Sequence, residues 1–367
     1  MREALLGRLA LSLLVLVAAW AGLAPGAAAD EAQTYAVVAG GPPNEEATVI
    51  SQAFLPETLT INAGDRITWS IEGFHTVTFL AGQARPPLFV PDPSDPGRRL
   101  FNPSASLPSG GTSFDGTALA NSGIPFLAQD PNAPQPPGPP TYTLTFPSAG
   151  TFPYVCLVHP DMVGTVIVQP GGARPMTPAQ ATAASNQVLE ARLGAVTARL
   201  AQAQAFPTRA VLAGVRVDAA EALVFAPSSL AVNEGDSVTW TTDTQDPHSV
   251  TFLAGGPELE NGGIEVEPQP SGPPALALSR RLLAPTDGGS TDGSGFVNSG
   301  LLWASGSTQG VPSAVSRFTL TFTRPGTYAY YCVVHGPAMS GTIIVQAASG
   351  APALESPAVQ APAPQVP

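Results

Sequence analysis

Residues 154–162 read YVCLVHPDM, and residues 331–339 read YCVVHGPAM. Each stretch brings a thiol, an imidazole and a thioether into one short turn. The spacing is Cys-x2-His-x2-Met in the first stretch and Cys-x2-His-x3-Met in the second. These side chains carry nitrogen and soft sulfur donors, so the spacing indicates a metal-binding turn in each stretch.

The two turns and two upstream residues account for every His and Cys of the chain. The sequence holds 4 His, 2 Cys and 4 Met. Two His lie in the turns, and the other two precede them along the chain. The sequence therefore predicts two sets of four ligands, which are His75, Cys156, His159 and Met162 in the first and His248, Cys332, His335 and Met339 in the second.

This donor set favours copper. Two imidazoles and a thiolate in a trigonal arrangement, with a weak axial thioether, form a blue-copper electron-transfer site. Zinc is the metal alternative, but the soft pairing of Cys with Met points to copper. A disulfide between Cys156 and Cys332 is a further alternative for an exported chain. Because each Cys lies beside its own His and Met, we expect two copper ions and no disulfide.

A long internal repeat contains the two ligand sets. Residues 54–69 match residues 225–240 at an offset of 171, and residues 75–80 match 248–253 at an offset of 173. The two cysteines are 176 positions apart. A repeat of this length is a duplicated domain, and a solenoid would need a much shorter period.

Each copy has the pattern of β-structure. Leu59 and Ile61 alternate before the turn at residues 62–65, and Ile67 and Trp69 alternate after it, which is typical of strands. With 41 Pro and 37 Gly, the chain can contain little helix. We expect an all-β fold with one domain at residues 30–170 and another at 207–347. Long insertions at 81–140 and 254–315 interrupt them and are either functional or disordered.

The segment between the domains, residues 171–206, is predicted to be helical. Thr177 and Pro178 are typical of a helix start. Apolar residues then recur at helical spacing, at Leu189, Leu193, Val196 and Leu200. We interpret this segment as a helical linker that packs on one domain. Residues 348–367, rich in Ala and Pro, are predicted to be a disordered tail.

The N-terminus predicts export. Arg2 and Arg8 form a positively charged region before an apolar stretch at residues 9–24, and small residues at 27–29 offer a cleavage site. The alternative is that this segment stays uncleaved as a membrane anchor. We expect membrane contact only in that case, and only through this segment. Residues 1–29 thus form a signal peptide, and the mature chain is expected in the periplasm, the cell envelope or the extracellular space. The net charge of -12 argues against a nucleic-acid partner.

The motifs resemble those of the cupredoxins, and among them plastocyanin and amicyanin. The pattern is Tyr-x-Cys-x-x-His-x-x-Met-x-Gly from Tyr154 to Gly164, with Gly-Asp-x-x-x-Trp and His-Thr-Val-Thr upstream. The resemblance covers residues 54–168 and 225–345, apart from the insertions. It implies two tandem Greek-key β-sandwiches, each with copper near one end. It also implies electron transfer through the exposed edges of His159 and His335.

The resemblance implies an electron carrier that exchanges single electrons with redox proteins such as a cytochrome. A copper protein for storage, delivery or tolerance is the alternative. We expect no enzyme, because all four His are used in the two sites. A basic partner is expected, since Glu258, Glu260, Glu265 and Glu267 cluster in the second insertion. Asp161, in the first turn, predicts a lower reduction potential for the first copper.

Overall fold

The computed structural model describes residues 31–41, 48–128, 139–173, 175–205, 209–269, 274–286, 289–306 and 308–347. The predicted signal peptide and the predicted C-terminal tail lie outside these ranges. Within the described ranges, no helix combines the length and the apolar character that a membrane crossing requires.

Two sheets form the first sandwich. One has the strand order β10-β5-β1-β3 and the other β4-β12-β11-β6-β9. In β5 every second residue is buried, which places Ile67, Trp69 and Ile71 in the core. The strands are β1 (Thr34–Gly40), β3 (Phe54–Leu55), β4 (Thr58–Asn62), β5 (Arg66–Glu72), β6 (Thr78–Phe79), β9 (Ala120–Asn121), β10 (Thr141–Thr145), β11 (Gly150–Val155) and β12 (Val163–Gln169).

The second sandwich repeats this arrangement. Its sheets have the orders β2-β14-β13-β16-β22-β20 and β15-β24-β23-β17-β21. Trp240 meets Tyr330 edge-on here as Trp69 meets Tyr154 in the first sandwich. The strands are β2 (Val49–Ser51), β13 (Ala210–Val217), β14 (Ala220–Ala226), β15 (Ser229–Asn233), β16 (Ser237–Thr241), β17 (Thr251–Phe252), β20 (Ser290–Thr291), β21 (Val297–Asn298), β22 (Arg317–Phe322), β23 (Gly326–Cys332) and β24 (Gly336–Gln346). The predicted fold class, tandem all-β sandwiches, is confirmed.

The two insertions pair with each other. Strands β7 (Phe89–Pro91) and β8 (Arg99–Phe101) from the first insertion join β18 (Ile264–Glu267) and β19 (Ala275–Leu278) from the second in one sheet of order β18-β19-β8-β7. Short helices α1 (Pro103–Ser106), α2 (Pro125–Ala128), α4 (Arg280–Leu283) and η1 (Glu260–Gly263) also lie in the insertions. This sheet of strands from both insertions connects the two halves.

Strand β2 also crosses between the halves. It lies in the first repeat by sequence, yet it pairs antiparallel with β14 at the edge of a sheet of the second sandwich. A buried apolar cluster continues across the same boundary, where residues of the first half pack with Leu278, Leu282 and Trp303 of the second. The two halves therefore share both a sheet and a core.

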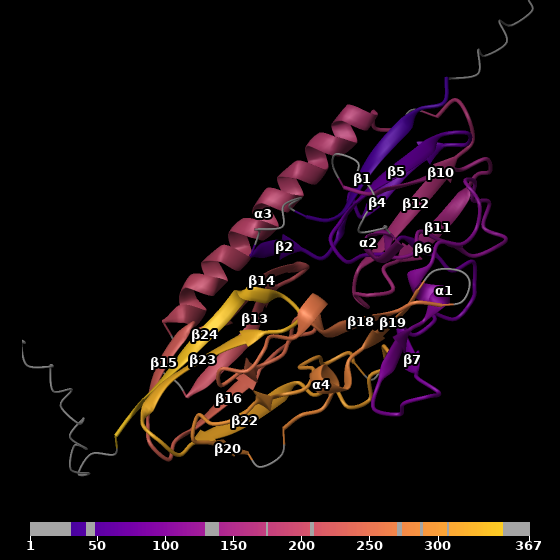
Figure 1. Cartoon of the computed structure of the whole chain (residues 1–367). Helices are drawn as coiled ribbons and strands as arrows, with labels where there is room; N and C mark the ends of the chain where they lie inside the picture. The colour runs from indigo at the N-terminus through magenta and orange to yellow at the C-terminus, as the bar shows by residue number, and fades with distance from the viewer. Residues whose placement is uncertain are drawn as a thin grey trace, which may run out of the picture.

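Helix α3 (Pro178–Gln204) begins with the predicted cap, because the Thr177 hydroxyl accepts a hydrogen bond from the Gln180 amide. Figure 1 shows α3 along one flank of both halves. It contacts β1 and β3 of the first sandwich and β13 and β14 of the second. Its buried residues include Ala181 near one end and Val196 near the other. The prediction that the helix packs on one domain is therefore wrong.

Candidate metal centres

The first ligand turn follows β11. Cys156 comes directly after the strand, and the chain turns at His159 and returns through β12. The Cys156 amide donates to the Met162 carbonyl oxygen at 2.9 Å, and the Met162 amide donates to the His159 carbonyl oxygen at 3.0 Å. His75 lies on the segment before β6 and reaches the same place from a different part of the sandwich.

Three donors of the first set converge on one point. His75 Nδ1 lies 3.0 Å from His159 Nδ1. Cys156 Sγ lies 3.9 Å from His75 Nδ1 and 3.6 Å from His159 Nδ1. All three side chains are buried. Two imidazole nitrogens and a sulfur facing each other inside an apolar end of a sandwich fit a trigonal copper ion.

The second set repeats this geometry. His248, Cys332 and His335 place their donor atoms within 4.8 Å of one another, and Cys332 Sγ lies 3.5 Å from His335 Nδ1. Among the described residues, His248 Nδ1 is a buried nitrogen with no hydrogen-bond partner. A buried nitrogen in this state fits a site in which it binds a metal ion.

The predicted axial residues, Met162 and Met339, are both buried, each with 1% exposure. Met162 lies in the turn before β12, whereas Met339 lies within β24. The second turn is closed by a pairing of Cys332 with Gly336, with an irregularity after Tyr331. The hairpin of β23 and β24 thus accommodates the extra residue of the second turn.

The surroundings favour thiolates. Backbone amides of Thr76 and Ser249 point at Cys156 Sγ and Cys332 Sγ, each at 3.4 Å. Burial raises the pKa of each thiol, but the neighbouring His rings outweigh burial and bring the pKa of each well below the usual range. Both cysteines are free, as predicted.

The residues that follow the upstream His fix the two loops. The Thr76 hydroxyl accepts from the Leu157 amide at 2.7 Å, and the Ser249 hydroxyl accepts from the Val333 amide at 2.8 Å. Each bond ties the upstream His segment to the residue after the Cys.

Two glycines give the upstream His rings their space, and the sequence reasoning did not single them out. A Cβ at Gly40 would lie 2.4 Å from His75 Nε2, and a Cβ at Gly214 would lie 2.7 Å from His248 Nε2. Both glycines also have positive φ, +90° and +81°. The signal that could have found them is the repeated pattern Val-x-Ala-Gly at residues 37–40 and 211–214.

The downstream His residues do not present open edges. The His159 side chain is 1% exposed and that of His335 is 16% exposed. The expected electron transfer through an exposed edge of His159 is therefore wrong. The edge is covered because the second half of the chain lies against it.

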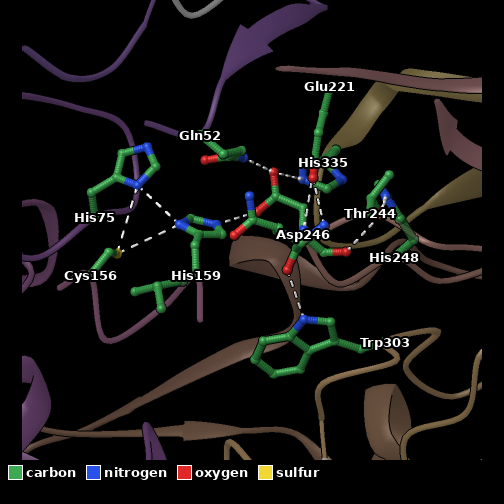
Figure 2. Close-up of polar contacts among 12 residues, drawn as sticks. Gln52, His75, Cys156, His159, Glu221, Thr244, Asp246, His248, Trp303 and His335 are labelled. Carbon is green, nitrogen blue, oxygen red and sulfur yellow. Dashed lines mark hydrogen bonds and ion pairs between the residues drawn. The ribbon is translucent and has the colours of Figure 1, made fainter. Parts of the chain in front are cut away.

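An acidic residue of the second half covers the edge of the His159 ring. Asp246, on the loop between β16 and β17, places Oδ1 2.8 Å from His159 Nε2. Its other oxygen, Oδ2, lies 3.9 Å from His335 Nε2. Figure 2 shows this carboxylate between the two His rings. Burial raises the pKa of Asp246, but the charge of His159 outweighs it and holds the pKa far below the usual range.

Sequence reasoning missed Asp246, although a signal was present. The repeat offset rises from 171 at Trp240 to 173 at His248, so the second copy holds two extra residues in this loop. The loop containing the two extra residues includes Gln245 and Asp246. The first copy has Gly73 at the position two residues before its His, where the second copy has Asp246.

The comparisons with known proteins agree with this geometry. A family model described as copper binding proteins of the plastocyanin/azurin family matches residues 212–346. The plastocyanin of Scenedesmus fuscus is 29% identical over 126 residues, which cover 34% of this chain and 89% of that protein. The plastocyanin of Synechococcus sp. (strain JA-2-3B'a(2-13)) is 30% identical over 124 residues, covering 34% and 64%.

Solved structures of amicyanin mutants are more distant. A Cu(I) form is 20% identical and covers 37% of this chain and 82% of that chain, with a TM-score of 0.21. An oxidised form is 22% identical with the same coverage and the same TM-score. These scores add nothing to the sheet topology described above. Residues 212–346 therefore match the plastocyanin/azurin family of copper-binding proteins, and the first half of the chain repeats the same sheet arrangement and the same His-Cys-His group.

Proposed function

We propose that the chain is an exported electron carrier that binds two type 1 copper ions. His75, Cys156, His159 and Met162 would hold one ion, and His248, Cys332, His335 and Met339 the other. The observation that carries this proposal is the pair of groups, in which every side chain except that of His335 is buried and two imidazoles and a thiolate face a common centre. Copper bound there would supply one-electron exchange between its two oxidation states.

The chain resembles electron carriers and not enzymes. All four His lie in the two groups, so no imidazole remains for a further, catalytic copper ion. The packed shell around each group also keeps the donor atoms in place. A site that changes little between oxidation states suits repeated electron transfer.

We propose redox proteins as partners and a location outside the cytoplasm. The acidic chain, with a net charge of -12, favours a basic partner such as a basic cytochrome, by electrostatic steering. The sequence of residues 1–29 supports export. The disulfide-permissive compartment that export implies is compatible with free cysteines here, because each thiolate has its own pair of His neighbours.

Copper titration of the mature chain tests the proposal. We expect two equivalents to bind and to give intense visible absorption from thiolate-to-copper charge transfer, with reversible one-electron reduction of both ions. Binding without that absorption would contradict the assignment of thiolate ligands. Binding with the absorption but without reversible reduction would favour storage or delivery over electron transfer.

A further inference from the structure

One buried carboxylate lies between the two copper-binding groups. Asp246 Oδ1 contacts His159 Nε2 at 2.8 Å, which is hydrogen-bond distance, and Asp246 Oδ2 lies 3.9 Å from His335 Nε2, which is an ion-pair contact. In both His residues Nδ1 faces the cysteine sulfur. In each ring, Nδ1 therefore faces the ligands of its own copper-binding group, and Nε2 faces the Asp246 carboxylate.

The structure holds this carboxylate in place from several sides. Gln52 Nε2 donates to Asp246 Oδ2 at 2.6 Å. Glu221 accepts from the Gln245 and Asp246 amides, at 2.5 Å and 3.4 Å. Trp303 Nε1 donates to the Gln245 carbonyl oxygen at 2.8 Å. These partners come from both repeats and from the second insertion, so the position of Asp246 depends on the assembled chain (Figure 2).

The bridge is specific to the arrangement of the two halves. A duplicated domain explains why each copy has its own ligand set, but it does not explain a group shared by both. Only the second copy has the two extra residues that bring Asp246 into this loop, and the first copy has Gly73 at the corresponding position. The chain therefore holds one bridge for two sites.

We propose that Asp246 joins the two sites into one redox unit, in which an electron passes between them through His159, Asp246 and His335. This inference rests on the proposed function. With copper bound in both groups, one ion would lose the electron that the other gains, and no proton or further reactant would be needed. Because the carboxylate lies closer to His159, its negative charge favours the oxidised ion of the first site more than that of the second. Transfer from the first site to the second is therefore the downhill direction.

Three variants test the bridge. Asp246→Leu removes it. Asp246→Asn keeps an acceptor for His159 and removes the charge, and the Gln52 amide can turn so that its oxygen accepts from the new amide. Asp243→Asn is the matched control, because this exposed residue of the same loop loses the same charge away from both His rings. Cys156→Ser and Cys332→Ser chains assign the spectrum and the reduction potential of each site beforehand.

Two measurements are made on the copper-loaded chains. Reduction potentials are obtained by spectroelectrochemistry, and exchange between the sites is followed after a short radical pulse delivers one electron per chain. We expect Asp246→Leu to slow exchange about tenfold or more, a loss typical of removing a partner that orients a metal ligand. Asp246→Asn should keep most of the rate and raise both potentials, that of the first site more. Asp243→Asn should behave like the parent chain.

The outcomes separate the bridge from the function on which it rests. If the parent chain fails to bind two coppers with thiolate absorption, the proposed function is wrong and the bridge with it. If the parent chain binds them and Asp246→Leu exchanges electrons as fast as the parent, only the bridge is wrong. If Asp246→Leu cannot hold copper, Asp246→Asn decides: an unequal rise in the two potentials supports the bridge, and a rise no larger than in Asp243→Asn overturns it.

Discussion

Arg216 Nη2, on β13 of the second half, lies 2.9 Å from Oδ2 of Asp161 in the first ligand turn. The sequence suggested that Asp161 lowers the potential of the first copper by its negative charge. The structure pairs that charge with a guanidinium, so its effect on the copper is largely compensated. Asp246 accounts better for a lower reduction potential of the first copper, because its carboxylate touches His159 directly.

Removing the pairing should restore the effect of Asp161. We expect Arg216→Gln to lower the potential of the first site by about 20 mV, because a partly exposed ion pair contributes on the order of 0.5 kcal/mol. The potential of the second site should change less. Spectroelectrochemistry of both sites checks this, with Arg324→Gln as a control. A first-site potential that stays constant or rises in Arg216→Gln would contradict the compensation.

The two copper sites should be lost one at a time. Cys156→Ser removes the thiolate of one group, and the other group keeps all of its own donors within its own repeat. We expect this variant to bind one coloured copper instead of two, and Cys332→Ser to do the same. Copper analysis and visible absorption of both variants test the expectation. Complete bleaching by either single change would mean that the ligand sets are shared between repeats.

Stability should depend on pH through Glu221. Burial and the neighbouring Asp246 raise the pKa of this fully buried carboxyl to about 7 from 4.5. The folded chain therefore holds the proton more tightly than the unfolded chain, and stability is lost as pH rises from about 4.5 through about 7.

We expect Glu221→Gln to remove this part of the pH dependence in the metal-free chain, on the order of 3 kcal/mol across the window. Urea unfolding of the metal-free parent and variant at several pH values measures it. Exposed Glu190→Gln is the matched control. Parallel curves for the parent and Glu221→Gln would show that Glu221 does not titrate in this range.

Electron transfer with a basic redox partner should depend on only a few of the glutamates predicted to form the acidic cluster of the second insertion. Arg98 Nη2 lies 2.9 Å from Glu265 and 2.6 Å from Glu267, so both acidic groups are already paired within the chain. Glu258 is exposed. We expect Glu258→Gln to slow electron transfer with a basic cytochrome more than Glu265→Gln does, with both effects shrinking as salt increases. A rate independent of salt would remove the electrostatic part of the proposal.

Both ligand turns can be predicted from sequence because their chemistry is local. Cys156, His159 and Met162 lie within seven consecutive residues, and the repeat shows which upstream His belongs to each turn. The sandwich follows from similar local patterns, such as the alternation of Ile67 and Trp69. These features depend on neighbours along the chain, so one sequence is sufficient.

The relation between the halves is not local, and the sequence does not predict it. Nothing near Val49 shows that β2 pairs with β14, since a short apolar segment fits either sandwich. The pairing of β8 with β19 and the contact between His159 and Asp246 depend on the same interface. The insertions were expected to be functional or disordered, and the pairing of β8 with β19 shows that they also connect the halves.

The strand pairing between the insertions has a consequence for how the chain is made. Phe101 ends β8, and its partner strand begins only at Ala275. At ordinary rates of translation the ribosome needs on the order of ten seconds to synthesise the residues between them. During that interval the first half has emerged with an unpaired sheet edge and an uncovered His159 ring, a state prone to aggregation. Each half of the duplication therefore depends on the other to complete a sheet and to cover a ligand ring, so the pair forms a single folding unit.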